Sequence, residues 1–289
     1  MNVLLPLLLA CAPPDQIDSG GSDPGTCGPE GGRSFWAVSA LEFAVIEGNV
    51  SDGFDLDGEQ TDAGDSSGCG VGDATAPDGR EGIDNAFGRM LPALEGTEFV
   101  AAAGLIAASI TSGELLLVAE VSGVESWEND DCVSAAFYRG FGAPMLTTSG
   151  EVLPDQTLEL DPFFPAQYFP EVAIVDGSVE GRPLSADMPM QILDAELSFA
   201  LRDGGIRLTI REDGTASGVL AGGIEVAYLL KLLAEQGTGI DDALEALIVS
   251  LLPVMADLAP DDQGECAQLS VTFLFEAVPV FVYEDQLSD

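Results

Sequence analysis

The residues best suited to chemistry lie between positions 51 and 85, in a segment rich in aspartate and glycine and nearly free of large apolar side chains. Closely spaced carboxylates on a backbone that can turn sharply are typical of calcium sites, because Ca²⁺ takes about six to eight oxygen ligands. The segment therefore predicts an irregular Ca²⁺ site that draws its ligands from several turns. The ligands that we expect are Asp55, Asp57, Asp78, Asp84 and Asn85.

The predicted site is not an EF-hand. If Gly58 occupied the sixth position of such a loop, Gly53 would stand first and Gly64 twelfth, where an EF-hand requires acidic side chains. A second interpretation stays open, in which the aspartates of this segment form solvated turns and cap a helix.

A second oxygen-rich cluster, formed by Glu128, Asp130 and Asp131, directly precedes Cys132. Two such carboxyl groups could serve a hydrolase in which one acid protonates the leaving group and the other attacks or activates water. We favour a solvated turn for this cluster and assign no catalytic residue. The chain has no histidine, which excludes Ser-His-Asp and Cys-His catalysis and His-ligated zinc sites.

The overall charge restricts the partners. The chain has 50 acidic and 9 basic residues, for a formal net charge of −41. Nucleic acid is excluded as a partner, because binding to phosphates needs clustered basic side chains. Hydrophobic residues make up 46% of the chain, which is enough to bury a core and excludes disorder of the whole chain.

The elements that must position these residues are mostly strands. Alternating apolar side chains predict one over residues 35–46. Related patterns predict strands over 114–122, 131–139, 171–179, 190–202, 205–211 and 269–283. Gly204-Gly205, directly after Asp203, predicts a tight hairpin between two of them.

Helices are expected in three places. Apolar side chains at helical spacing predict a helix capped by Asp84-Asn85, and an alanine-rich run predicts another over 97–110. Residues 224–258 predict a helical hairpin with arms over 224–234 and 241–258. The whole pattern predicts a mainly β fold, sandwich-like with inserted α-helices, and the alternative is an α+β fold. No Pro/Gly-rich linker interrupts residues 34–289, so we expect a single domain there.

The N-terminus predicts export. Residues 1–10 are almost purely apolar and end in Leu8-Leu9-Ala10-Cys11, which resembles the lipobox of bacterial lipoproteins. The resemblance implies a signal peptide over 1–10, a lipid on Cys11 that attaches the chain to the membrane and, with Ala12 following, the outer membrane. Residues 11–33 are rich in Pro and Gly, which predicts a flexible tether. The alternative is an apolar terminus with a chance cysteine.

The remaining four cysteines are Cys27, Cys69, Cys132 and Cys266. An even number in an exported chain predicts two disulfides, for which three pairings are possible. We favour Cys132–Cys266 with Cys27–Cys69, since Cys266 stands in a turn before the last predicted strand and could hold that strand to the body.

An aromatic stretch, Phe163, Phe164, Tyr168 and Phe169, lies among three prolines. If it is exposed, it is a candidate surface for a partner or for stacking on a sugar. If it is buried, it is a loop folded over the core, which we favour because large aromatic side chains are mostly buried.

Several short segments resemble an uncharacterised group of secreted lipoproteins from myxobacteria and related bacteria. The segments are GFDLDG, PDGREGIDN, NDDC, LPDQTLELD and GECAQLSVTFLFEAVP. In that group a DLDG segment precedes a GxDN segment, and a C-terminal cysteine opens the last strand. The resemblance implies habitat and architecture but attaches no activity. We therefore expect a non-enzymatic envelope lipoprotein that binds an unidentified protein or polysaccharide, with a carboxylate-dependent hydrolase of polysaccharides as the alternative.

Overall fold

A computed structural model describes residue 27 and residues 32–65, 69–94, 100–192, 195–236 and 242–283. The predicted signal peptide, Cys11 and nearly all of the predicted tether lie outside these residues. Within them, no helix is long and apolar enough to cross a membrane.

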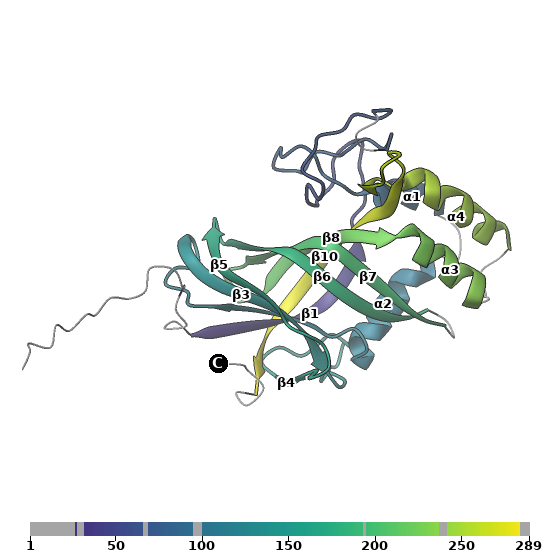
Figure 1. Cartoon of the computed structure of the whole chain (residues 1–289). Coiled ribbons are helices and arrows are strands. Elements are labelled where there is room, and N and C mark those ends of the chain that lie inside the picture. The colour runs from purple at the N-terminus through teal and green to yellow at the C-terminus, as the bar shows by residue number, and fades with distance from the viewer. Residues whose placement is uncertain are drawn as a thin grey trace, which may run out of the picture.

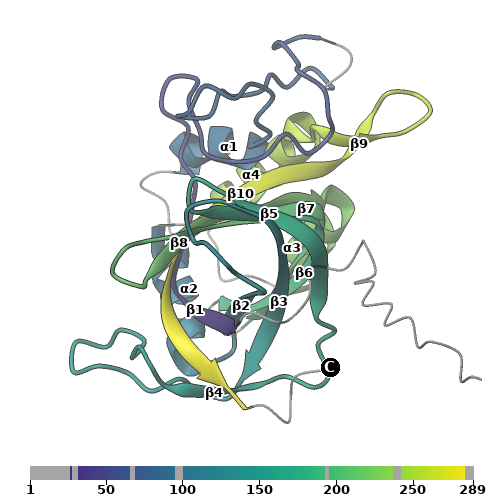
Figure 2. The same cartoon turned by 90° about the vertical axis from the view of Figure 1, so that its left-hand side faces the viewer.

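The main body is one antiparallel sheet that closes on itself (Figures 1 and 2). Its eight strands follow one another around the ring, and the last pairs with the first. In ring order they are β1 (Arg33–Phe43), β2 (Leu117–Ser122), β3 (Asp130–Phe141), β5 (Gln167–Val175), β6 (Ser178–Ile192), β7 (Ala195–Ile210), β8 (Ala216–Glu225) and β10 (Cys266–Val282).

The predicted mainly β class is confirmed, but the strands form a closed barrel and not two stacked sheets. Closure comes from the pairing of the first and last strands of the ring, together with the pairing of the two strands on either side of β4 (Thr157–Leu160) in the sequence. β1 pairs with β10, with Phe35 opposite Val280, and β3 pairs with β5, with Ala136 opposite Tyr168. A closed sheet leaves no edge among these strands, so all of them are hydrogen-bonded on both sides.

The barrel interior is filled by side chains. Alternate residues of β10, Leu269, Val271 and Phe273, point inward and have no exposed surface. Helix α2 (Val100–Ser112) contacts both β1 and β6, which lie on opposite sides of the ring, and its Ile106 and Ile110 join the same core. This helix therefore closes one end of the barrel, behind the ring in Figure 2.

The other end is covered by the connection between β2 and β3. In this connection Trp127 packs edge-on against the inward-facing Trp36 of β1, with ring centroids 5.6 Å apart. The backbone of Glu128 accepts a hydrogen bond from Gly177 in the β5–β6 turn, across the ring from β1. The connection is thus held at both sides of this barrel end.

Three further helices lie beside the barrel (Figure 1). Helix α1 (Ala86–Leu94) contacts β10, while α3 (Val226–Gln236) and α4 (Asp242–Met255) contact each other and β10. The predicted helix after Asn85 and the predicted helical hairpin are therefore confirmed. Asn85 caps α1, because its Oδ1 accepts a hydrogen bond from the Gly88 amide at 3.2 Å.

Two short strands extend the sheet. β4 (Thr157–Leu160) pairs with the ends of β3 and β10, and its Leu158 packs against Phe35 and Val118 on the outer face of the barrel. β9 (Leu258–Pro260) pairs with the start of β10.

The predicted hairpin at Gly204-Gly205 is wrong, because both glycines lie inside β7. They sit at a bulge in the pairing of β7 with β8, after Asp203 with a φ of 51°. A Cβ at Gly204 would lie 2.0 Å from the carbonyl oxygen of Ala221, so glycine permits a close approach of two strands here.

The favoured disulfide pairing is also wrong. The structure joins Cys27 to Cys132 and Cys69 to Cys266, with Cα–Cα distances of 5.1 and 5.9 Å. The turn between β9 and β10 brings Cys266 beside the Asp-rich segment, which the spacing of the cysteines does not reveal. Both bonds therefore tie connecting segments to strands of the barrel.

We expect Phe273→Ala to lower the free energy of unfolding by about 3–5 kcal/mol, because it leaves a cavity in the barrel core. Phe163→Ala is the matched control, since Phe163 is 92% exposed and its loss should change the value by no more than about 0.5 kcal/mol. Urea unfolding under non-reducing conditions measures both. Equal effects of the two substitutions would contradict the barrel core described above.

Candidate metal centre

The Asp-rich segment is attached to the outside of the barrel through Phe54. This side chain is 1% exposed and packs against Val219 and Ala221 on the outer face of β8. The guanidinium groups of Arg207 and Arg182 lie 4.7 and 5.4 Å from the centre of its ring. Phe54 thereby fixes the position of Asp55, the next residue.

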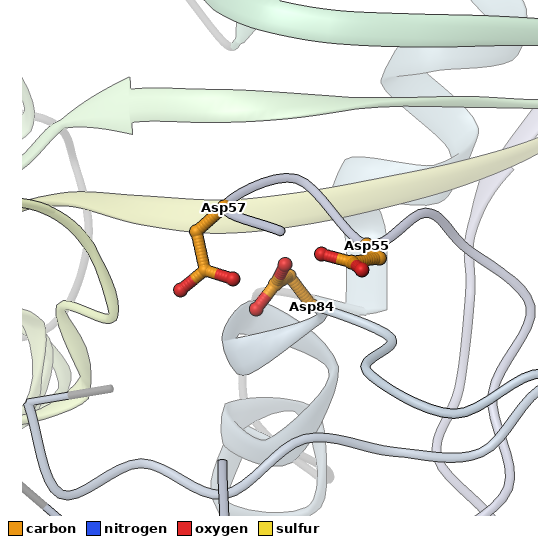
Figure 3. Close-up of side chains that lie close together, drawn as sticks. All are labelled: Asp55, Asp57 and Asp84. Atoms are coloured by element: carbon orange, nitrogen blue, oxygen red, sulfur yellow. The ribbon is translucent and has the colours of Figure 1, made fainter. Parts of the chain in front are cut away.

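Isolated bridges then bring the two halves of the segment together. The amide of Asp84 donates a hydrogen bond to the carbonyl of Phe54 at 2.9 Å, and the amide of Leu56 donates one to Oδ2 of Asp84 at 2.7 Å. As a result one carboxylate oxygen from each of Asp55, Asp57 and Asp84 lies within 4.8 Å of the others. Figure 3 shows the three carboxylates pointing toward one another, with Asp84 between the other two.

The turn that carries Asp55 and Asp57 is stabilised by those same side chains. Oδ1 of Asp55 accepts the amide of Gly58 at 2.6 Å, and Oδ1 of Asp57 accepts the amide of Glu59 at 2.9 Å. Gly58 has a φ of 79°, which glycine adopts without strain. The turn thus orients both carboxylates toward Asp84.

The three carboxylates differ in burial: Asp84 is buried, Asp55 is half-buried and Asp57 is exposed. The cluster is therefore open to solvent at Asp57 and closed at Asp84. Carboxylate oxygens are hard ligands that suit divalent cations, and these three residues could hold a metal ion.

Burial raises the pKa of Asp84 to about 9. The hydrogen bond from Leu56 lowers it, but repulsion from Asp257, Asp57 and Asp73 raises it further. The pKa of Asp73 is raised as well, mainly by burial. A hydrogen bond from the Thr61 amide lowers it, and repulsion from Asp57 and Asp55 raises it further. A bound cation would favour the charged form of these carboxyls and offset their repulsion.

A buried polar network supports the cluster from the side of the barrel. Ser270 of β10 donates a hydrogen bond from Oγ to Asp257 at 2.5 Å and accepts one from the amide of Ala86, the first residue of α1, at 2.7 Å. The hydroxyl of Thr272 donates to the carbonyl of Asp84 at 3.4 Å. The outer face of β10 thus fixes the start of α1 and, with it, Asp84.

Sequence reasoning missed Asp73, Asp257 and Ser270. A signal for the last of these exists, because Gln268, Ser270 and Thr272 alternate with apolar residues along β10. Burial raises the pKa of Asp257 to about 7. A catalytic acid must reach its substrate, but the side chains of Asp257 and Asp84 are both buried and line neither of the two large surface clefts.

The two other predicted ligands have different partners. Oδ2 of Asp78 accepts a hydrogen bond from Nε of Arg80 at 2.8 Å in an exposed turn, and its pKa is lowered by the Arg80 backbone and side chain. The side chain of Asn85 caps α1 and donates hydrogen bonds to the carbonyl of Ala44 and to Oγ of Ser51. The structure therefore brings together three of the five predicted ligands.

The second acidic cluster forms a turn. The carboxylate of Asp130 accepts hydrogen bonds from the amides of Glu125, Cys132 and Ser126, and these bonds lower its pKa. A lowered pKa suits a turn-forming carboxylate and not a general acid.

The raised pKa of Asp84 predicts a pH dependence. The folded chain keeps a proton on this carboxyl between about pH 4 and pH 9, whereas the unfolded chain releases it near pH 4. In EDTA the free energy of unfolding should therefore fall as the pH rises through this range, by up to about 1.4 kcal/mol per pH unit from this group. Asp84→Asn should remove that part of the decline in urea titrations at pH 5, 6, 7 and 8.

Asp78→Asn is the control for the loss of one negative charge from the same segment. It should leave the slope of stability against pH as steep as in the unmodified chain. Equal slopes for the unmodified chain and Asp84→Asn would mean that Asp84 is charged in the folded chain.

Comparison with known protein families, with curated proteins and with solved structures finds no match for this chain. The resemblance to the lipoprotein group stays a prediction. The closed barrel and the three converging carboxylates are therefore the basis for assigning a role.

Proposed function

We propose that this chain is a non-enzymatic lipoprotein domain of the outer membrane, which binds a surface component and is stabilised by Ca²⁺ at Asp55, Asp57 and Asp84. The observation that carries the proposal is the convergence of these three carboxylates, one of them buried, on the segment that links β1 to α1. The ion would be structural and would hold the Asp-rich segment to the barrel.

The donor set favours calcium over other metals. Carboxylates are hard oxygen ligands, whereas zinc prefers thiolate and imidazole, and the chain has no histidine. Cys27, Cys69, Cys132 and Cys266 are all in disulfides. Mg²⁺ needs a near-ideal octahedron, while Ca²⁺ accepts the irregular set that several turns provide.

The proposed location rests on three features of the chain. The lipobox-like segment ending in Cys11 predicts a lipid anchor, and residues 11–33 predict a tether. Disulfides persist in oxidising compartments, which fits an exported protein. The proposed partners are the membrane, through the anchor, and a polysaccharide or protein of the envelope.

Ca²⁺ should raise the melting temperature of the full chain by several degrees relative to EDTA, with NaCl held high and Mg²⁺ as the comparison ion. The reason is that a ligand which binds only the folded chain stabilises it, by about 2.7 kcal/mol at a concentration one hundred times its Kd. Asp57→Asn and Asp84→Asn should each abolish the rise. Differential scanning calorimetry at pH 7.5 measures the shift.

Asp78→Asn should respond to Ca²⁺ like the unmodified chain, because Asp78 lies in a separate exposed turn with Arg80. In EDTA, Asp84→Asn should melt no lower than the unmodified chain, since the amide replaces a carboxyl whose raised pKa keeps it neutral at this pH. Superimposed melts with and without Ca²⁺ would refute the calcium role.

Cys11→Ser should move the protein from the membrane fraction to the soluble fraction of the cells that express it, since the thiol would carry the anchoring lipid. Fractionation followed by mass spectrometry of the N-terminal peptide measures this. An unmodified Cys11 in membrane-associated protein would argue against lipidation.

A further inference from the structure

Two surface clefts adjoin on the outside of the barrel. One, of about 1160 Å³, lies at the barrel end covered by Trp127, and the other, of about 880 Å³, lies between the Asp-rich segment and the outer face of the strands from β5 round to β1. Asp176 and Arg211 line both clefts. The clefts therefore meet at these two residues and are together called the groove; the larger of them alone exceeds the about 300–1,000 Å³ that a single small ligand fills.

Aromatic rings lie at one end of this groove. Trp36 and Trp127, the two tryptophans of the chain, both line it together with Phe281. Trp127 is 38% exposed and Phe281 is 58% exposed, while the buried Trp36 supports Trp127 from below. Half-exposed aromatic rings held rigidly at a cleft can stack on an apolar ring face at little entropic cost.

The rest of the groove presents fixed polar groups. Nη1 and Nη2 of Arg211 bind the carboxylate of Glu276, and Arg207 binds Glu180 at 3.1 Å. The hydroxyls of Ser178 and Thr209 are hydrogen-bonded to each other at 2.7 Å. Side chains that are hydrogen-bonded to one another in this way keep a fixed orientation. They can therefore donate hydrogen bonds to, and accept them from, the hydroxyl groups of a ligand without moving.

The charge of the groove disfavours an anionic ligand. Its four arginines, Arg33, Arg80, Arg207 and Arg211, are each paired with a carboxylate. An anionic ligand would have to displace those carboxylates and approach a chain with a net charge of −41. A small cation would fill only part of the groove, whereas a polysaccharide chain can extend along it.

The backbone of the groove argues against an extended peptide. All the strands that line it, from β5 through β6, β7, β8 and β10 to β1, are hydrogen-bonded to neighbours on both sides. A peptide could not add to this sheet as a further strand, which is the usual way that an extended peptide binds a sheet.

We infer that this groove, from Trp127 to the Asp-rich segment, binds a chain of a neutral polysaccharide, with a sugar ring stacked on Trp127. The inference rests on the proposed role as a binding domain and names its ligand class and its site. It does not depend on the calcium centre, because the carboxylates of Asp55, Asp57 and Asp84 do not line the groove.

The test uses affinity electrophoresis of the full chain in gels that contain laminarin, mannan, xyloglucan or pullulan, with alginate as the acidic comparison. At least one neutral polysaccharide should retard the chain and change its tryptophan fluorescence saturably. Trp127→Ala should weaken that retardation by about tenfold or more in Kd. Phe141→Ala, which removes an exposed aromatic ring outside the groove, should leave it unchanged.

Arg211→Gln provides a second variant if Trp127→Ala does not fold, and it should weaken binding as well. Retardation by none of the neutral polysaccharides, retardation by alginate alone, or equal effects of Trp127→Ala and Phe141→Ala would overturn the inference. All gels are run in EDTA and in Ca²⁺. A thermal shift with Ca²⁺ but no binding to polysaccharide would refute polysaccharide binding in the groove and leave the calcium centre supported. Binding to polysaccharide without a thermal shift would refute the calcium centre and leave the groove supported.

Discussion

The pairing of β10 with β1 is the interaction on which the rest of the structure depends. It joins the last strand of the chain to the first and closes the barrel. The inward face of β10 contributes Leu269, Val271 and Phe273 to the core, while its outward face contributes Ser270 and Thr272 to the network beneath the candidate metal centre. One strand therefore fixes both the hydrophobic interior and the start of α1. Because its partners lie so far away in the sequence, little of this arrangement can form before the whole chain is present.

Two arginines of this acidic chain lie where the Asp-rich segment meets the barrel. Arg182 and Arg207 flank the ring of Phe54, and Arg182 also donates a hydrogen bond to the backbone carbonyl of Asp55 at 2.7 Å. Their charges oppose the repulsion that the aspartates of the segment would otherwise exert on the acidic surface. Among the described residues, the carboxylates of Asp55, Asp57 and Asp84 form no salt bridge with an arginine, and they could hold a metal ion instead.

Local patterns predicted what is local in this fold. Helical spacing after Asn85 gave α1 and its cap, and the stripes over 224–258 gave the α3–α4 hairpin. The DLDG turn and the residue before Asn85 gave three ligands that do meet. Closure of the sheet, the disulfide pairing and the role of Gly204 could not be predicted, because each depends on contacts across the barrel. Asp257 could not be predicted for the same reason. It follows a helix, and the residues next to it in the sequence do not indicate that β10 buries it.

The disulfide between Cys27 and Cys132 changes how the barrel carries mechanical load. A pull on the chain before Cys27 passes through the sulfur atoms directly into β3, and residues 28–131 are bypassed. β1 follows Cys27 in the sequence and would be the first strand peeled from the sheet if the bond were absent. With the bond in place, the force acts on β3, which pairs with β2 on one side and with β5 on the other. The bond therefore shields the β1–β10 pairing, which closes the barrel, from a pull at the N-terminus.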